Sequence, residues 1–152
     1  MSDMKTEKLS TLYPLAQQKM LSFITSANSK GYNIGAFETL RTWDKQEQYY
    51  QEGRSVPGKI ITNSEPGLSW HQYGAACDIA FIDENGNWNW PPDNDPRWIE
   101  LSKIAESFGL ESGVNWGDLD HYQLTGGMKI QDAYDAFMAA GISAVQIKLV
   151  SA

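Results

Sequence analysis

The order of apolar and polar residues predicts a helix near the start of the chain. Between positions 14 and 30, apolar residues recur every three or four positions, which gives a helix one continuous apolar face. Pro14 suits the first helical turn, and Gly31 ends the pattern. We therefore expect a helix at 14–30 that packs on a core through Ala16, Met20, Phe23, Ile24 and Ala27.

The same reasoning predicts three more helices and four short strands. Thr42 is a suitable N-cap for a helix at 43–52, and Asp95 caps a helix that Pro96 opens and Gly109 ends. Short stretches with alternating apolar and polar residues instead indicate strands. The other predicted elements are a helix at 130–140 and strands at 33–40, 75–82, 120–124 and 144–150.

This arrangement favours an α+β fold over a parallel α/β fold. The predicted strands are few, short and separated by long loops, whereas a doubly wound sheet is built from regular βαβ units. We therefore expect a small, mainly antiparallel sheet flanked by helices. The chain contains no repeat, low-complexity tract or domain linker, so residues 1–152 are expected to form one domain. Its core would span about 12–125, with a helix and a strand at 126–152.

Composition and charge narrow the classes of function. Hydrophobic residues make up 41% and charged residues 20%, which is typical of a globular domain. A net charge of −7 without a basic cluster argues against nucleic-acid binding. The N-terminus lacks an apolar signal core and no segment reaches membrane-spanning length, so we expect synthesis in the cytoplasm without membrane insertion. Cys77, the only cysteine, is expected to be buried and unreactive.

The first histidine lies in a polar segment that precedes a predicted strand. In that strand, Asp78 shares its face with the small residues Ala76 and Ala80, which leave space above the sheet. A carboxylate in such a place needs a positive partner, because burying an unpaired charge is costly. His71 lies seven residues earlier, across Gly74, where the chain can bend back. One nitrogen and one oxygen ligand suit zinc.

The second histidine, His121, adds a third ligand of the same kind. Two histidines and one aspartate leave a fourth tetrahedral position open for water, as catalytic zinc sites do. Asp118 and Asp120 are the nearby carboxylates that could accept a proton from this water. Taken singly, each residue also has a structural explanation, as a hydrogen-bonded histidine or a solvated carboxylate. Their combination favours a metal centre.

Two motifs resemble those of a known family. The pattern Ser-x-His-x-x-Gly-x-Ala-x-Asp at 69–78 resembles the signature of the VanY-like and VanX-like zinc peptidases, which share the hedgehog-type fold. The pattern Asp-x-x-His at 118–121 resembles their second signature, in the same chain order. The preceding segment, with Leu40-Arg41-Thr42, Gln46 and Gly53-Arg54-Ser55, is also similar, so the resemblance covers about 12–125.

The resemblance implies one zinc ion per chain and a role for each site residue. The implied ligands are His71, Asp78 and His121. Asp118 would be the general base, and Arg41 would polarise the scissile carbonyl and stabilise its oxyanion. Ser69 would contact the substrate or support the site, and Gln46 would contact the substrate. Asp120 precedes His121 along the predicted strand and is therefore expected to point away from the site.

The resemblance also implies hydrolysis of the peptidoglycan stem peptide. Aspartate rather than glutamate before the second histidine is similar to L-alanyl-D-glutamate endopeptidases of phage endolysins and wall-remodelling enzymes. One alternative is a D-alanyl-D-alanine carboxypeptidase or dipeptidase, and another is a zinc-containing domain that binds wall peptide or protein without cutting. Asp118 and Arg41 argue against the last, since a structural metal needs neither. We expect a monomer that reaches the wall through a holin or another export route.

Overall fold

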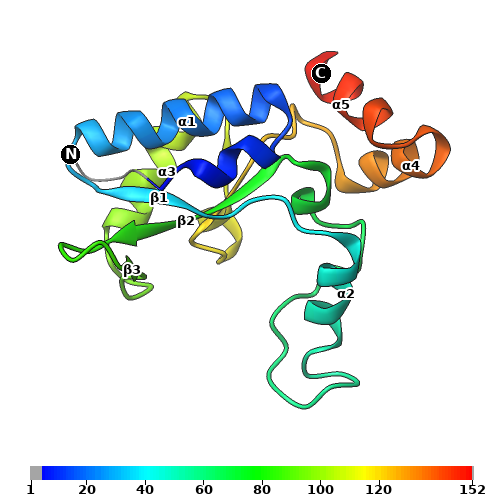
Figure 1. Cartoon of the computed structure of the whole chain (residues 1–152), viewed down its shortest axis with the longest axis horizontal. Coiled ribbons are helices and arrows are strands. Elements are labelled where there is room, and N and C mark those ends of the chain that lie inside the picture. The colour runs from blue at the N-terminus through cyan, green and yellow to red at the C-terminus, as the bar shows by residue number, and fades with distance from the viewer. Residues whose placement is uncertain (1–4, 152) are drawn as a thin grey trace.

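An antiparallel sheet lies at the centre of the computed structural model, which describes residues 5–151 (Figure 1). The strand order is β1-β2-β5-β4, and β3 pairs with β2. The strands are β1 Ile34–Glu38, β2 Ala76–Ile82, β3 Trp88–Asn89, β4 Glu111–Ser112 and β5 His121–Gln123. The predicted α+β class with a small antiparallel sheet is confirmed.

Helices lie on both sides of this sheet. The α-helices are α1 Pro14–Ser29, α2 Trp43–Gln51, α3 Arg97–Ser107, α4 Ile130–Ala140 and α5 Ile142–Ser151. Within the described part of the chain, the 3-10 helices are η1 Glu7–Thr11, η2 Trp70–Tyr73 and η3 Gly113–Trp116. In Figure 1, α1 runs along one side of the sheet, whereas α2 and the loop after it extend from the other side. Within residues 5–151, no helix combines the length and apolar character needed to cross a bilayer.

The C-terminal element differs from the prediction. Residues 144–150 were expected to form a strand, but they belong to the helix α5. Val145 and Leu149 are four positions apart and both buried, while Ile147 between them is 68% exposed. A spacing of four places the buried pair on one helical face, next to α4 and η2. A short apolar run is compatible with both the helical and the strand periodicity, and packing against the rest of the fold selects the helix here. The two-residue strands β3 and β4 are too short for alternation to be visible.

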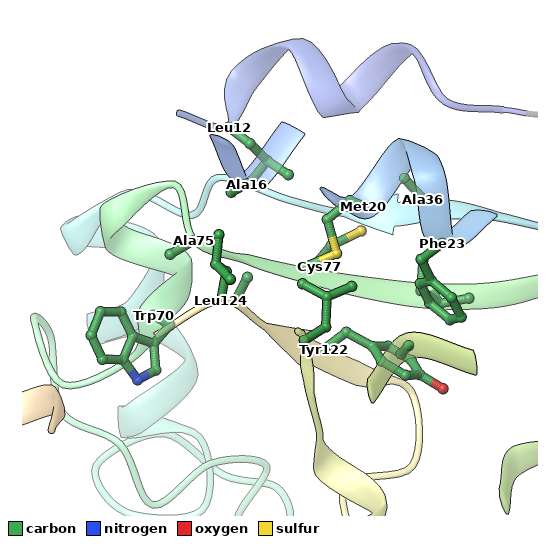
Figure 2. Close-up of a cluster of buried hydrophobic side chains, with 14 of the residues drawn as sticks. Leu12, Ala16, Met20, Phe23, Ala36, Trp70, Ala75, Cys77, Tyr122 and Leu124 are labelled. Atoms are coloured by element: carbon green, nitrogen blue, oxygen red, sulfur yellow. The ribbon is translucent and has the colours of Figure 1, made fainter. Parts of the chain in front are cut away.

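Packing against α1 determines which face of the sheet is buried and which carries polar side chains. Met20 and Phe23 of α1 point toward Cys77 of β2 and Tyr122 of β5 (Figure 2), and the Phe23 and Tyr122 ring centroids are 4.8 Å apart. Cys77 is fully buried, as predicted. Because successive side chains on a strand point to opposite faces, the residue after Cys77 and the residue before Tyr122 face away from α1.

Candidate metal centre

Three potential metal ligands meet on the sheet face opposite α1. Asp78 and His121 are direct cross-strand partners, and His71 reaches the same place from η2. Their ligand atoms all lie within 4.8 Å of one another. Asp78 Oδ1 lies 3.3 Å from His71 Nε2 and 3.5 Å from His121 Nδ1. Atoms bound tetrahedrally to one zinc ion are about 3.3 Å from each other, so the spacing fits a shared cation.

Hydrogen bonds orient both imidazole rings. His71 Nδ1 lies 2.7 Å from the Thr39 carbonyl oxygen, which can only accept, so this nitrogen carries the proton. We assign the proton of His121 to Nε2, which donates to Gln123 Oε1 at 2.7 Å. In each ring the other nitrogen faces Asp78: it can donate a proton to that carboxylate, and once deprotonated it offers a lone pair to a metal, as in metal-binding histidines. Gln123 was not among the predicted site residues. Its only signal is alternation, which puts it on the same face as His121.

The turn that carries His71 is built by its flanking residues. The Ser69 hydroxyl accepts a hydrogen bond from the His71 backbone N–H at 3.3 Å, and the Gln72 side chain completes a capping box. Gly74 then adopts a left-handed conformation, with φ of 67°, that directs the chain toward β2. Ser69 also lines the cleft. The bend expected at Gly74 is present, and the Ser69 side chain holds the turn.

The electrostatics of the cluster favour a cation. Burial alone would raise the pKa of Asp78, but the charge of His71 and hydrogen bonds from both histidines outweigh it and lower that pKa. Burial would likewise lower the pKa of His121, but the hydrogen bond and charge of Asp78 raise it. Asp78 thus remains ionised and attracts positive charge to the point where the two rings converge.

Arg41 is held rigidly beside the cluster. Its Nε donates to Glu38 Oε1 at 2.8 Å and its Nη1 donates to Gln46 Oε1 at 2.8 Å. Nη2 lies 3.6 Å from Asp78 Oδ2, and the guanidinium carbon lies 4.8 Å from the centroid of the Tyr49 ring. These contacts fix a positive charge at the cleft, next to a metal ligand.

Gln46 does not occupy the expected place in the cleft. Its side chain is fully buried, so the structure corrects the expected substrate contact. Gln46 Nε2 donates to the Ser64 carbonyl at 2.7 Å, and Oε1 accepts hydrogen bonds from Arg41 and from Gln72 Nε2. Gln46 therefore joins α2 to the loop after it and to η2, and it positions Arg41.

Asp118 lies next to the three ligands without belonging to them. Its Oδ2 is 4.0 Å from His121 Nδ1, and its side chain is 55% exposed. Gly113 fixes the turn: the Asp118 backbone N–H donates to the Gly113 carbonyl at 2.8 Å, and a Cβ atom on Gly113 would collide with the Asp118 carbonyl. A solvent-accessible carboxylate is thus held at the edge of the cluster.

Asp120 does not point away from the site, contrary to the expectation. It lines the same cleft as Asp118, because β5 begins at His121 and strand alternation does not extend back to Asp120. Its backbone carbonyl accepts a hydrogen bond from the Ile79 N–H at 2.8 Å. Burial, followed by the charges of Asp78 and Asp118, raises the pKa of Asp120 to about 7.

The cluster lies in a cleft of about 530 Å³. Residues from α2 and the following loop, including Tyr49 and Ile61, line it together with Arg41. Trp116 and Asp118, from η3 and the turn after it, also line it, and the Trp116 ring centroid lies 6.1 Å from that of His121. The cleft therefore places a guanidinium, a candidate metal cluster and the Asp118 carboxylate, which lies outside the ligand set, within one cavity.

Comparison with known proteins is consistent with this geometry. Residues 9–120 match the family model described as VanY, D-alanyl-D-alanine carboxypeptidase. The chain is 30% identical over 119 residues to the peptidoglycan L-alanyl-D-glutamate endopeptidase CwlK of Bacillus subtilis (strain 168). The aligned residues make up 74% of this chain and 71% of CwlK.

Solved structures share the fold. The LD-carboxypeptidase LdcB matches with a TM-score of 0.59 at 18% identity, over 82% of this chain and 64% of LdcB. The L-Ala D-Glu endopeptidase ChiX of Serratia marcescens matches with a TM-score of 0.55 at 20% identity, over 79% of this chain and 85% of ChiX. The chain thus spans just under two thirds of LdcB and most of ChiX.

Proposed function

Because this chain belongs to the VanY family, we propose that it is a zinc-dependent peptidase that cleaves the peptidoglycan stem peptide between L-alanine and D-glutamate. The observation that carries the proposal is the convergence of His71, Asp78 and His121, with both rings oriented by hydrogen bonds, beside the Asp118 carboxylate, which lies outside this ligand set. The 30% identity to an L-alanyl-D-glutamate endopeptidase supports the choice of bond.

The donor set fits zinc. Two imidazole nitrogens and one carboxylate oxygen are common zinc ligands, and three protein ligands are typical of catalytic sites. Both outer ring nitrogens have acceptors, which stabilises the tautomers that a metal requires. A zinc ion bound in such a site would act as a Lewis acid and lower the pKa of a water molecule to about 7.

Asp118 and Arg41 supply the remaining chemistry. Asp118 can take a proton from the attacking water and give it to the leaving amine. Water then contributes its hydroxyl to the alanyl carbonyl carbon and its remaining proton, by way of Asp118, to the D-glutamate nitrogen as the C–N bond breaks, which gives a carboxylic acid and a free amine. Arg41, held by Glu38 and Gln46, can stabilise negative charge on the carbonyl oxygen without reorganising.

The products of digestion test this proposal. Purified peptidoglycan would be incubated with the zinc-loaded protein and the soluble products identified by mass spectrometry. We expect peptides that begin with D-glutamate and glycan that keeps L-alanine. Release of free D-alanine would instead support a D-alanyl-D-alanine carboxypeptidase, the activity in the family description. Co-sedimentation with the wall without any product would support a non-catalytic binding domain.

The role in the cell is also a proposal. The Asp-x-x-His motif at Asp118 resembles that of phage endolysins, which supports a bacteriolytic function carried out by a monomer on the wall after release from the cytoplasm. Added protein should then reduce the turbidity of cells whose outer layers have been permeabilised. Expression in the cytoplasm should lyse cells only when a holin is co-expressed. Lysis without the holin would contradict the proposed route.

A further inference from the structure

A second hollow adjoins the metal cleft. Its volume is about 240 Å³, and its lining includes Trp90 and Asp93, from the segment after β3, and residues 117–120. Asp118 and Asp120 line both this hollow and the main cleft, so the turn at 117–120 is the wall that the two share. In Figure 1, β3 lies near one end of β2 and α2 lies near the other end. The second hollow is therefore on the side away from the α2 loop.

An exposed and oriented tryptophan marks this hollow. Trp90 is 44% exposed, whereas Trp98, which also lines the hollow, is 2% exposed. The Trp90 ring stands edge-on to Phe37, with centroids 4.8 Å apart and an angle of 89° between the rings. Lys8 anchors this neighbour by donating to the Phe37 carbonyl at 2.7 Å. The Trp90 ring thus packs against Phe37 while nearly half of its surface stays accessible, as an aromatic side chain of a ligand site requires.

The polar groups of the hollow suit a neutral sugar. Asp93, Asp118 and Asp120 supply carboxylate oxygens, which accept hydrogen bonds from hydroxyl and acetamido N–H groups. The same carboxylates disfavour an anionic ligand. A sugar ring has apolar C–H faces and a rim of hydroxyl groups, so it can cover an aromatic face while it donates to nearby carboxylates. A single amino-sugar ring also matches the small size of the hollow.

The chemistry of the stem peptide fixes which part reaches this hollow. D-glutamate carries a free carboxylate, which the three aspartates of the hollow would repel, so D-glutamate lies on the side away from the hollow. L-alanine is joined by an amide to the lactyl group of N-acetylmuramic acid, so the sugar side is neutral. One residue spans at most about 3.6 Å, so a cut after L-alanine places the sugar close to the metal cluster. Asp118 lines the hollow, and its Oδ2 lies 4.0 Å from Nδ1 of the candidate ligand His121, so the hollow begins close to the metal cluster.

We propose that the hollow between Trp90 and the turn at 117–120 binds the N-acetylmuramoyl group that carries the stem peptide. This inference rests on the proposed function, since it assumes cleavage next to L-alanine. The substrate then runs across the cleft with D-glutamate on the side away from the hollow and the sugar toward Trp90. The enzyme should accordingly prefer stem peptides that are still attached to glycan over free peptides.

Two synthetic substrates test the subsite. One is an N-acetylmuramoyl tripeptide, and the other is the same tripeptide with a simple N-acetyl group. We expect kcat/KM to be about tenfold higher for the first, the size of one well-placed aromatic contact. Trp90→Ala should bring this ratio close to one, and Trp90→Phe should keep part of it. Trp88→Ala is the matched control, because Trp88 also contacts Phe37, at 5.4 Å, yet lies outside the hollow's lining; its ratio should match the wild type.

The outcomes separate the subsite from the peptidase. Equal kcat/KM values in the wild type, or a full ratio in Trp90→Ala, would overturn the sugar subsite and leave the peptidase assignment intact. Failure to cleave either substrate would overturn the peptidase assignment. In that case, titration with N-acetylmuramoyl-L-alanine amide, in which the lactyl carboxyl is blocked and the sugar is neutral, followed by tryptophan fluorescence, decides the subsite. Saturable quenching that Trp90→Ala loses supports it, and a lack of saturable change refutes it.

Discussion

The candidate metal ligands and the candidate base are held by two different kinds of structure. Asp78 and His121 are paired across β2 and β5, whose other faces are buried against α1. Asp118 instead lies on a turn after η3, and 55% of its side chain is exposed. The His71 and His121 side chains are almost completely buried. One region is rigid and desolvated, and the other is open to water.

This difference matches what each task requires. A metal site needs fixed donors and a low local dielectric, which strengthen the attraction for a cation. A general base must exchange protons with water and the leaving group, which an exposed carboxylate on a turn can do. Metal affinity and proton transfer should therefore respond to different mutations.

Removing a ligand should have the largest effect. His121→Ala is expected to abolish both zinc binding and hydrolysis, because the two remaining ligands cannot form the site. Metal analysis after gel filtration, together with an assay on purified peptidoglycan, measures both. As a control, wild type treated with a chelator should also lose activity and regain it with added zinc, whereas the variant should not. Full activity of the metal-free wild type would refute the zinc assignment.

Changing the base should affect catalysis alone. Asp118→Asn keeps the shape of the side chain but cannot accept a proton, so kcat should fall by about 10²–10⁴-fold, the usual contribution of a positioned general base. Zinc content and thermal unfolding should stay close to wild type, since Asp118 is exposed and outside the ligand set. Asp120→Asn is the comparison, with a smaller expected loss. If Asp120→Asn is inactive and Asp118→Asn is not, the assignment is reversed.

The two regions also differ in how well the sequence predicts them. Alternation over residues 75–82 places Asp78 opposite Cys77, and the structure has this arrangement. Such periodicity is local and needs no knowledge of neighbouring segments. The position of Asp120 depends instead on β5 starting one residue later than predicted, at His121. Strand ends are set by pairing with other segments, and a residue just before a strand need not follow the alternation of side chains within it.

Long-range contacts account for the other errors. The burial of Gln46 results from hydrogen bonds to Ser64 and Gln72, which are 18 and 26 positions away. A polar residue on a helix gives no local sign that distant segments will cover it. Likewise, packing against α4 and η2 selects the helix α5, and the short apolar run at 144–150 gives no sign of these contacts.

Weakening the support of a ligand should have an intermediate effect. Gln123→Leu removes the acceptor for His121 Nε2, so the ring loses its fixed tautomer and zinc affinity should fall by about 10–100-fold. Competition with a coloured chelator measures the affinity. Gln123→Glu retains an acceptor oxygen and should bind zinc nearly as well as wild type. Equal affinity in the Leu and Glu variants would show that the ring is held by the sheet alone.

The smallest expected effect concerns the turn that carries the base. Gly113→Ala places a Cβ atom against the Asp118 carbonyl, so the backbone of the turn must shift and move the carboxylate. Misplacing a catalytic group by about 1 Å can reduce the rate by up to 10²-fold, and we expect about a tenfold fall in kcat because an exposed turn can partly relax. Zinc affinity should change little, since β2, β5 and η2 hold the ligands.

The control for this substitution separates local displacement from general loss of stability. Gly86→Ala lies in a turn after β2, where no atom is within 4 Å of the added Cβ, although its positive φ of 82° still causes strain. It should lower the free energy of unfolding by about 1 kcal/mol and leave kcat unchanged. If Gly113→Ala loses zinc in parallel with activity, the turn and the ligands form one unit. The contrast between the rigid and the open region would then not hold.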